Sequence, residues 1–535
     1  MSNGLLLWVD DEIELLRGHI MFLERKGYQV MTASNGTDAV DICREKTFDL
    51  VLLDEMMPGI SGLEALRQIK ELQPSTPVVM VTKSEEENIM HQAIGAKIAD
   101  YLIKPVNPSQ ILLTLKKNIH RREIVSAVTQ SSYQQSFAAI STQINGCRTW
   151  DDWVDVYRRL VHWELELSSA DSNMSEMLRA QKEEADNGFA KYIRSNYMEW
   201  IARRSRTRTP SAGRRDTAPR SADDDTPMMS TDVFKKTIFP LLDAGKKVCL
   251  IVIDNFRYDQ WKALSPDLGD MFDITEQLYM SILPTATQYA RNAIFSGLMP
   301  NLIAEMFPEL WVDEDEEKGK NLNEEPLIRT QMERFRRKNT FSYHKINDSP
   351  GMERLLQQHS QLARHDLNVI VVNFIDMLSH ARTESKMVRE LAGDESAYRS
   401  ITLSWFRHNA IGELFRLLSQ SGRTVVLTTD HGSIRVEKPV KIIGDRKTNT
   451  NLRYKLGRNL TCDAKDVFII REPAKALLPS PNISTSYAFA TGSSFFAYPN
   501  NFNYYAGYYK DTFQHGGISM EEMIVPLITL QPRRR

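Results

Sequence analysis

The stretch TVVLTTDHGS, Thr424–Ser433, places an acid and an imidazole directly after a run of apolar and β-branched residues. Such a run is typical of a strand buried on both faces of a parallel sheet. Asp430 and His431 would then stand where this strand leaves the sheet, which in an open α/β sheet is the edge that binds ligands. Gly432 follows at once, and without a side chain it lets the backbone turn away from the site.

The overall composition limits what this edge can do. A chain of 535 residues is too long for one hydrophobic core, since domains usually hold about 150 residues. The formal net charge of -2 gives no global field for nucleic acid or membranes, so any polyanion site must be local. The four cysteines are far apart in the sequence, which favours a reducing compartment. With no signal-peptide pattern and no bilayer-length apolar run, we expect a cytoplasmic protein without membrane insertion.

Changes in composition along the chain divide it into four regions. Residues 1–120 alternate short apolar runs with amphipathic segments, which predicts βαβ units and a receiver-type doubly wound parallel sheet. Residues 121–202 lack strand-like runs and show helical spacing of apolar residues, so we expect a small helical bundle. Residues 203–230 are rich in Arg and nearly free of large apolar side chains, as in a flexible linker. Residues 231–535 form a second α/β region, so the predicted fold class is α/β.

Polar side chains follow the predicted strands of the first region. Because the carboxyl ends of parallel strands share one edge, these side chains should converge on one pocket. Crowded carboxylates favour a hard divalent cation such as Mg²⁺, and with charge neutralised Asp54 would be able to attack a phosphoryl group. Each residue alone is more often a cap or a turn residue, but that interpretation does not explain several of them in register. They are Asp10, Asp11, Asp54, Thr82 and Lys104.

The motifs DDE at Asp10–Glu12, DEMMPGISG at Asp54–Gly62 and DYLIKP at Asp100–Pro105 resemble those of the receiver domain of two-component response regulators. The resemblance implies that Asp54 is the phosphoacceptor, that a sensor histidine kinase is a partner, and that the Lys104–Pro105 bond is cis. It also implies the pocket around Asp54: Asp10, Asp11 and the Met56 carbonyl for Mg²⁺, Thr82 and Lys104 for the phosphoryl group, and Tyr101 as an aromatic switch.

The second α/β region repeats the pattern of a strand followed by polar residues. VCLIVID ends at Asp254, LNVIVVNFID ends at Asp376 with His380 four residues later, and His515 stands in QHGGISMEEMIVP. With the acid and imidazole of the opening stretch they form a mixed nitrogen and oxygen donor set, which suits Zn²⁺ or Mn²⁺ better than Ca²⁺. The set is too large for one tetrahedral site but fits two metals about 4 Å apart. A lone residue of this kind is usually structural; the whole set at one edge favours metals.

A hydroxyl group is the remaining part of such a site. The stretch LPTATQYARNAIFSGLMP, Leu283–Pro300, offers Thr285 and Thr287 in a turn before a predicted helix. Backbone N–H groups at a helix start favour a phosphate, although a plain helix cap is the commoner role for such a threonine. On these grounds the two hydroxyls remain alternatives.

Five motifs of this region together resemble the PglZ-type branch of the alkaline phosphatase superfamily, over residues 235–530: VIDNFRYDQ, PTAT followed by SGLMP, DMLSH, TTDHG and HGGISMEEMIVP. The resemblance implies two zinc sites, one formed by Asp254, Asp430 and His431 and the other by Asp376, His380 and His515. It favours Thr287 over Thr285 as the nucleophile between them, because the family places this group last in the PxxT turn.

A receiver, a helical bundle and a PglZ-type domain in this order resemble the PorX-like response regulators that are associated with type IX secretion. The resemblance implies control of secretion and contact with a sigma factor or a secretion-system component. Receivers of this type pair through the face containing Tyr101 and the helix after Pro105. We therefore expect a homodimer that phosphorylation of Asp54 promotes.

Basic residues crowd the stretch Glu437–Asn459, just after the acid and imidazole pair. A solvated loop is the ordinary interpretation. Beside two metals it would instead hold a second phosphate, which favours a phosphodiester or an oligonucleotide as substrate. The candidate contacts are Arg446, Lys447 and Arg453.

Two classes of function stay open. In one, Asp54 controls a zinc-dependent phosphodiesterase. In the other, the chain is a non-enzymatic signalling scaffold that uses the phosphatase fold to bind partners. A complete ligand set favours the enzyme, since a scaffold does not need one.

Overall fold

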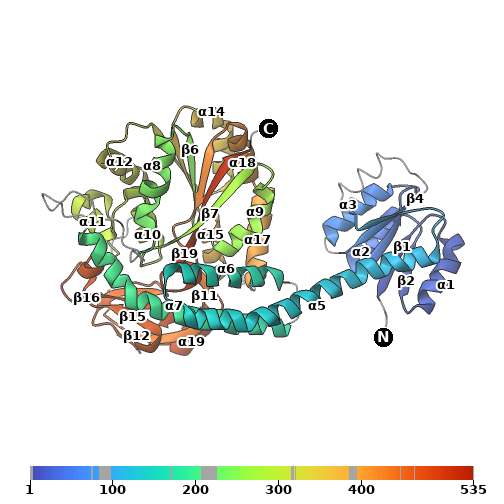
Figure 1. The fold of residues 1–535 in the computed structure, drawn as a ribbon, viewed down its shortest axis with the longest axis horizontal. Helices are drawn as coiled ribbons and strands as arrows, with labels where there is room; N and C mark the ends of the chain where they lie inside the picture. Colours follow the sequence, from blue (N-terminus) through green and yellow to red (C-terminus); the bar gives the residue numbers. More distant parts are fainter. Residues whose placement is uncertain are drawn as a thin grey trace. The chain divides into compact units, whose positions relative to one another are not determined.

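The computed structural model describes residues 4–73, 76–82, 98–168, 172–206, 226–314, 319, 321–384, 394–445, 448–462 and 464–533. The chain divides into two compact units, Met1–Gln134 and Gln135–Arg535. Each has its own sheet with flanking helices (Figure 1). The predicted α/β class is therefore confirmed.

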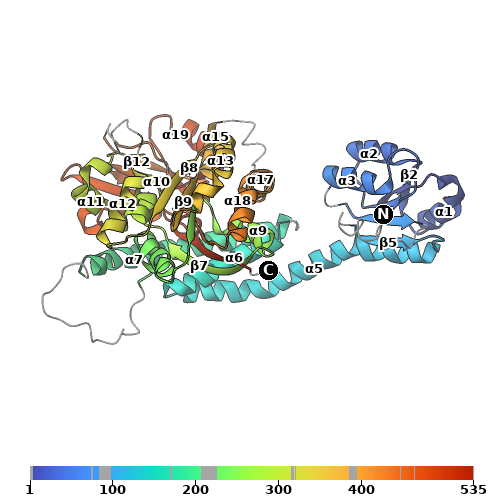
Figure 2. The ribbon, with the colours of Figure 1, turned by 90° about the horizontal axis from the view of Figure 1, so that it is seen from above.

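The first unit is built on a parallel sheet with the strand order β2-β1-β3-β4-β5. The five strands are short apolar runs of residues 1–120, LLLWV, QVMTA, LVLLD, VVMVT and DYLI, and β3 is buried along its whole length. Two helices cover each face, α2 and α3 on one and α1 and α5 on the other (Figure 2). The strands are β1 Leu5–Val9, β2 Gln29–Ala33, β3 Leu50–Asp54, β4 Val78–Thr82 and β5 Asp100–Ile103. The helices are η1 Ile13–Leu16, α1 Arg17–Arg25, α2 Gly36–Glu45, α3 Gly62–Leu72 and α5 Pro108–Gly146.

The last of these helices belongs to both units. α5 begins at Pro108, beside the first sheet, and continues to Gly146 without a break. The region expected as a helical bundle, residues 121–202, therefore takes its first helix from the preceding region. Its other helices are α6 Trp150–Glu166 and α7 Ser172–Arg206. Of the expected linker, residues 207–225 lie outside the described residues.

Aromatic rings hold α6 against α7. The Trp153 ring lies 5.7 Å from the Phe189 ring in an edge-on contact and 6.1 Å from the Tyr192 ring, measured between centroids. Such contacts are preferred by aromatic pairs and bury a large apolar area. Gly188 allows this close packing, because a Cβ atom at its position would meet the Trp153 ring at 2.6 Å.

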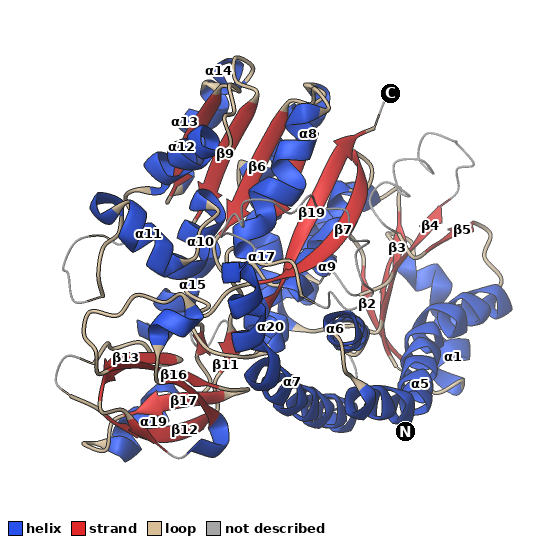
Figure 3. Ribbon diagram, turned by 60° about the vertical axis from the view of Figure 1, so that its left-hand side comes forward, coloured by secondary structure: helices blue, strands red, loops and turns tan. Residues whose placement is uncertain are grey.

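The second unit contains a larger sheet with the strand order β7-β19-β10-β6-β9-β8 (Figure 3). β10, β6, β9 and β8 run parallel, whereas β19 is antiparallel to both β10 and β7. β6, β9 and β10 are fully buried, as their apolar sequences predict. The strands are β6 Val248–Ile253, β7 Phe272–Met280, β8 Phe341–Ile346, β9 Leu367–Val372, β10 Thr424–Thr428 and β19 Ile524–Pro532.

Helices pack around this larger sheet, and several of them begin directly after its strands. In chain order they are η2 Ser230–Asp232, η3 Phe234–Ile238, α8 Phe239–Asp243, α9 Tyr258–Leu268, α10 Thr287–Ser296, α11 Pro300–Met306, η4 Pro308–Leu310, α12 Glu324–Arg334, α13 Ser349–Gln357, α14 His359–Leu362, α15 Phe374–Glu384, α17 Glu395–His408, α18 Ile411–Gln420 and α20 Met520–Met523.

Short strands form smaller sheets at one end of the larger sheet (Figures 1 and 3). These sheets pair β11 with β18, β12 with β14 and β17, and β16 with β13 and β15. Their elements are β11 Ile434–Arg435, β12 Lys438–Ile443, β13 Tyr454–Arg458, β14 Thr461–Cys462, η5 Ala464–Asp466, β15 Val467–Ile470, η6 Pro473–Ala476, β16 Thr485–Ala490, β17 Ser494–Ala497, α19 Phe502–Tyr509 and β18 Phe513–Gln514.

Within the described part of the chain, we find no helix with the length and apolar character needed to span a lipid bilayer.

We expect Gly188→Ala to lower the midpoint of thermal unfolding. Alanine favours a helix by about 1 kcal/mol over glycine, but forcing a methyl group into the buried Trp153 ring costs about 1–3 kcal/mol. Gly507→Ala is the matched control, because it also lies within a helix and a Cβ atom there would meet nothing within 4 Å. The control should raise the midpoint or leave it unchanged. Equal shifts in both variants would contradict the proposed contact.

Candidate functional site

The opening stretch folds as predicted. β10 ends at Thr428, and Asp430 and His431 follow it with no exposed surface. Gly432 is required here because a Cβ atom would lie 2.0 Å from the backbone oxygen of Glu521 in α20. The backbone N–H of Gly432 also donates to the carbonyl oxygen of Glu522 at 3.2 Å. The loop after β10 is therefore clamped against α20.

The six side chains predicted as metal ligands form two groups of three. In each group, one ligand atom per residue lies within 4.8 Å of the others. The first group is Asp254, Asp430 and His431, and the second is Asp376, His380 and His515. We call them the first and second triads. The first triad is fully buried, whereas in the second the side chain of His380 is 65 % exposed. The cluster thus opens to solvent on the side of the second triad.

The two triads are neighbours. The rings of His431 and His515 stack with their centroids 4.1 Å apart. His515 Nε2 lies 3.6 Å from Asp376 Oδ1, and His380 Nε2 lies 3.4 Å from Asp376 Oδ2. Asp254 follows β6 and Asp376 lies in the first turn of α15 after β9, so neighbouring strands deliver these acids to the same edge.

Backbone carbonyls orient two of the imidazoles. His431 Nδ1 lies 3.1 Å from the oxygen of Gly432, and His515 Nδ1 lies 3.2 Å from the oxygen of Thr285. A neutral ring that donates from Nδ1 presents an unprotonated Nε2, and in both rings Nε2 faces the carboxylates. Burial lowers the pKa of His431, and burial with the neighbouring His431 lowers the pKa of His515 to about 4. The neutral form is the one that binds metals.

The carboxylates of the cluster respond differently to their surroundings. Burial raises the pKa of Asp254 to about 7, with Arg291 opposing the shift and Asp430 adding to it. Burial also acts to raise the pKa of Asp376. The hydrogen bond to His380 and the nearby His515 have a larger effect, so the pKa of Asp376 is lowered. Buried carboxylates this close together favour a bound cation. The donor set of carboxylate oxygens and imidazole nitrogens fits two zinc ions by its chemistry.

Sequence reasoning missed Arg291, which lies among these acids. It is fully buried in α10 and forms ion pairs with Asp254, with Asp430 at 3.0 Å and with Glu324 at 3.2 Å. Its sequence did carry a signal, since an arginine within the apolar run YARNAIF stands one turn after Thr287 on the same helix face. Asn255 was also missed; its Nδ2 lies 3.5 Å from Asp376 Oδ1.

The two candidate hydroxyls have different environments. Thr287 begins α10, and its Oγ1 lies 3.1 Å from His431 Nε2 and 3.4 Å from Asp254 Oδ1. Thr285 is fully buried; its hydroxyl donates to the oxygen of Gly517 at 2.9 Å and accepts from the N–H of Gly516 at 3.1 Å. Thr285 thus stabilises the loop that carries His515, and Thr287 is the hydroxyl placed beside the first triad.

The structure describes only one of the three expected phosphate contacts after β10, because Arg446 and Lys447 lie outside the described residues. Arg453 has no exposed surface, and its guanidinium pairs with both carboxylate oxygens of the buried Glu522, at 3.1 and 2.6 Å. The prediction that Arg453 contacts the substrate is therefore wrong, because a buried and paired charge is not available to a ligand.

The pocket of the first unit lies at the carboxyl edge of its sheet. Lys104 Nζ lies 2.7 Å from Asp10 Oδ2 and 2.8 Å from Asp54 Oδ2. Asp10 and Asp54 are buried, Asp11 is exposed beside them, and ligand atoms of the three acids lie within 4.8 Å of one another. The Lys104–Pro105 bond is cis, as the resemblance implied. Met56 lies in the turn after β3 with its side chain exposed.

Charge in this pocket is only partly balanced. Burial raises the pKa of Asp54, the contact with Lys104 lowers it, and the outcome is an upward shift. Burial opposes the charge of Lys104, but its hydrogen bonds to Asp10 and Asp54 outweigh burial and raise its pKa. Asp54 Oδ1 is buried and has no hydrogen-bond partner among the described residues. This donor set fits a divalent oxygen-loving cation. The side chains of Thr82 and Tyr101 lie outside the described part of the structure.

Comparison with known proteins divides the chain into three matched segments. The family model of the response regulator receiver domain matches residues 6–116. The model of the PorX response regulator linker domain matches residues 123–201. The model of the BREX system PglZ alkaline phosphatase-like domain matches residues 233–530, which is more than half of the chain.

Several individual relatives are similar to about a quarter of the chain. The transcriptional regulatory protein ResD of Bacillus subtilis is 39% identical over 128 residues, and SrrA of Staphylococcus aureus is 32% identical over 123 residues. These alignments cover 24% and 23% of this chain, which spans about half (50%) the length of the curated relatives it matches. A CheY-like receiver structure from Methanospirillum hungatei is 29% identical, with a TM-score of 0.22, covering 23% of this chain and 98% of that one.

The carboxyl edge of the larger sheet and the matched segments lead to the same assignment. The two triads and Thr287 lie within residues 233–530, and the Asp54 pocket lies within residues 6–116. The chain belongs to the family of the BREX system PglZ alkaline phosphatase-like domain, which is joined here, as in a PorX-like fusion, to a response regulator receiver domain and a PorX linker domain.

Proposed function

We propose that this chain is a response regulator in which phosphorylation of Asp54 controls a zinc-dependent phosphodiesterase. The observation that carries the proposal is the position of Thr287 Oγ1, 3.1 Å from His431 Nε2 at the edge where the two triads meet. A scaffold that only binds partners has no need of a hydroxyl in contact with such a donor set.

The receiver would supply the regulatory input. A receiver domain implies a histidine kinase as its partner. Asp54 would accept the phosphoryl group, with Mg²⁺ held by Asp10, Asp11 and the Met56 carbonyl. Lys104 already contacts Asp54 and would pair with the added negative charge. Thr82 and Tyr101 are proposed to complete the response to phosphorylation.

The chemistry of hydrolysis would begin at Thr287. Two zinc ions in the triads would neutralise phosphate charge and lower the pKa of the attacking hydroxyl. Thr287 Oγ1 forms a bond to phosphorus while the bond from phosphorus to the leaving oxygen breaks, and the leaving oxygen takes up a proton. Water then breaks the new threonyl ester and restores the hydroxyl. The N-terminus of α10, where Thr287 lies, would direct backbone N–H groups toward a phosphate bound there.

Arg291 would act as a positioning residue for this reaction. Its ion pairs with Asp254 and Asp430 hold two acids of the first triad in place. Because Thr287 lies one turn earlier in the same helix, Arg291 also fixes where the hydroxyl lies relative to those acids.

The wider setting follows from the PorX linker domain over residues 123–201. We infer a role in type IX secretion, with a sigma factor or a secretion-system component as a further partner. A phosphodiester, such as an oligonucleotide, remains the proposed substrate class. The support for a second phosphate site is now confined to Arg446 and Lys447, because Arg453 is committed to Glu522.

Asp54→Ala should abolish labelling of the full chain by a small phosphodonor in the presence of Mg²⁺. The reason is that the receiver match supports the assignment of the phosphoryl group to Asp54, a buried carboxylate that contacts Lys104 and has neighbouring acids for the metal. The label that remains on the protein after separation under acidic conditions measures the outcome. Asp41→Ala, which removes an exposed carboxylate on α2, should label normally. Undiminished labelling of Asp54→Ala would refute the assignment.

Thr287→Ala should retain two zinc ions per chain and lose hydrolysis of a model phosphodiester by on the order of 10³-fold or more. All six proposed ligands remain in this variant, whereas the attacking oxygen is gone. Metal analysis and a diester assay on the same preparation measure both halves.

Thr287→Ser is the matched control, because it keeps the hydroxyl and should retain measurable activity. Full activity in Thr287→Ala would assign the nucleophile elsewhere. Two bound zinc ions without hydrolysis in the unaltered protein would favour the scaffold function instead.

Beryllofluoride, which mimics the phosphoryl group, should shift the full chain from monomer toward dimer in sedimentation experiments. Phosphorylation can shift this equilibrium only if it favours the pairing conformation, and Lys104 is the group that changes partners when Asp54 is modified. Asp54→Ala should sediment identically with and without beryllofluoride. An unchanged monomer in the unaltered protein would refute coupling through dimers and leave both site assignments standing.

A further inference from the structure

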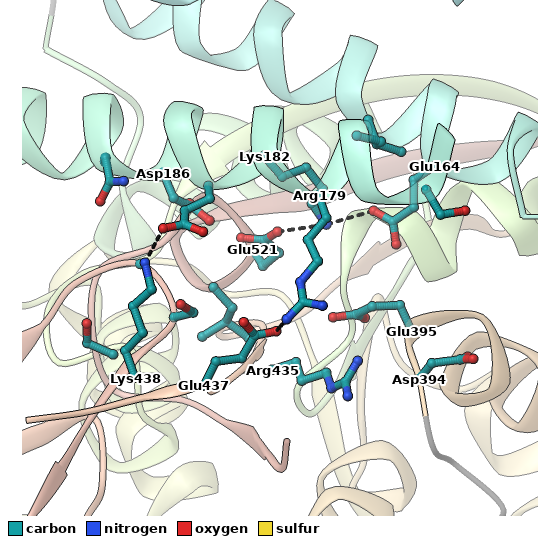
Figure 4. A pocket seen from close by; sticks show the side chains of 18 of the residues that line it. Glu164, Arg179, Lys182, Asp186, Asp394, Glu395, Arg435, Glu437, Lys438 and Glu521 are labelled. Carbon is teal, nitrogen blue, oxygen red and sulfur yellow. Dashed lines mark hydrogen bonds and ion pairs between the residues drawn. The ribbon is translucent and has the colours of Figure 1, made fainter. Parts of the chain in front are cut away.

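A cavity apart from the two triads lies in the 135–535 unit, where α7 meets the PglZ domain. Its volume is about 320 Å³, and its walls come from α6, α7, the start of α17, β11, β12 and α20 (Figure 4). This size is at the lower end of that of small-molecule sites. Among the described lining residues none belongs to either triad, so the cavity is separate from the proposed active site.

The lining of this cavity carries an excess of negative charge. Acidic side chains outnumber basic ones among the described lining residues, and every basic one already has a carboxylate partner. The pairs are Lys182 with Glu164 and Glu521, Arg399 with Glu164, Arg179 with Glu437, Arg435 with Asp511, and Lys438 with Glu183. Asp186, Asp394 and Asp466 have no ion-pair partner within the described residues. All the basic side chains of the walls are therefore paired with carboxylates, whereas these three acids are not paired with a basic side chain.

Two of the acids face one another across a domain boundary. Figure 4 shows Asp186 from α7 beside Glu521 from α20, and each is only 5% exposed. Asp186 Oδ1 accepts from the N–H of Met520 at 2.9 Å, which ties the two segments together. Burial and the charge of Glu521 raise the pKa of Asp186 well above its usual range. A cation between these two groups would relieve their repulsion.

A carboxylate oxygen of Glu521 lacks a hydrogen-bond donor, which is a second reason to expect a ligand. Its Oε1 pairs with Lys182 at 3.0 Å, but its Oε2 is buried without a hydrogen-bond partner among the described residues. A buried carboxylate oxygen left without a donor is costly. Glu521 lines the cavity, so a small rotation of its side chain would bring Oε2 to a donor that is bound there.

Apolar groups in the walls distinguish between kinds of cation. Leu167, Leu178 and Ile434 line the same cavity as the acids. A bare divalent ion requires several oxygen ligands around it and gains nothing from such groups. Methylene chains that carry ammonium groups would use both kinds of wall, since the chain packs on apolar side chains while its ends meet carboxylates.

We propose that this cavity binds a small organic polycation of the polyamine class. One ammonium group lies between Asp186 and Glu521 and donates to the unpartnered Oε2. Asp394 and Asp466 lie on different elements of the lining, and either one offers a carboxylate for a further ammonium group; the connecting methylene groups pack on the apolar wall.

Binding at this place would connect the PorX linker domain with the proposed active site. Asp186 belongs to α7, while Glu521 belongs to α20, whose backbone clamps Gly432 next to His431. A ligand held by both acids therefore fixes α7 to the segment that supports the first triad. This inference does not depend on hydrolysis, because it concerns binding alone.

Isothermal titration of the full chain with spermidine tests the proposal. We expect one binding site per chain and a spermidine-dependent rise in the midpoint of thermal unfolding. Asp186→Asn and Glu521→Gln should each weaken binding by about tenfold or more, because each removes one charge from the ammonium site. Asp186→Asn keeps the shape of the side chain and removes like-charge repulsion, so its unfolding midpoint without ligand should not fall. Glu521→Gln also removes one of the two carboxylates that pair with Lys182, so this variant is judged by its loss of spermidine binding and not by its midpoint.

Glu199→Gln is the matched control, since it removes an exposed carboxylate from the same helix and should bind spermidine normally. Glutamate should not bind, which separates charge recognition from non-specific stabilisation. The proposal is overturned if spermidine fails to bind, if both cavity variants bind it as tightly as the control, or if Ca²⁺ or Mg²⁺ rather than spermidine is lost with these substitutions.

Discussion

Repulsion between buried carboxylates is the constraint on which the rest of the PglZ domain depends. Asp254 and Asp430 leave adjacent strands, β6 and β10, and come together where water is excluded. An uncompensated charge there would cost several kcal/mol. Arg291 provides the compensation and is itself paired with Glu324. These ion pairs hold α10 in the position that places Thr287 beside His431.

The receiver meets the same constraint with different elements. Its paired acids, Asp10 and Asp54, also follow neighbouring strands, but their compensating cation is Lys104 in the loop after β5. A lysine on a loop is a compact point charge on a flexible stem, whereas an arginine within a helix is fixed by several partners. The difference suits the proposed roles, since a switch must change partners and an active site must keep its geometry.

The sequence predicted the features that depend on the order of residues within short segments. Apolar runs predicted the strands, and the rule that strand ends share an edge brought the six candidate ligands together from four separate motifs. Their division into two triads came from the family resemblance. Sequence reasoning failed where the answer depends on which residues of a loop are covered. Arg453 looked like part of a solvated basic stretch, but it lies in the bend just before β13, where its side chain is buried and pairs with Glu522. The continuation of α5 past residue 120 was also missed, since composition changes there while the helix does not end.

The place of β19 in the larger sheet has a consequence for how the protein is made. This strand lies between β7 and β10, although both are synthesised long before it. Until the ribosome has released β19, β7 has no neighbour in the sheet and one side of β10 stays open for pairing with other chains. The receiver has no such dependence, because its strands all lie within the first 103 residues. The nascent chain can thus complete its regulatory domain while the sheet that supports the proposed active site still awaits its last strand.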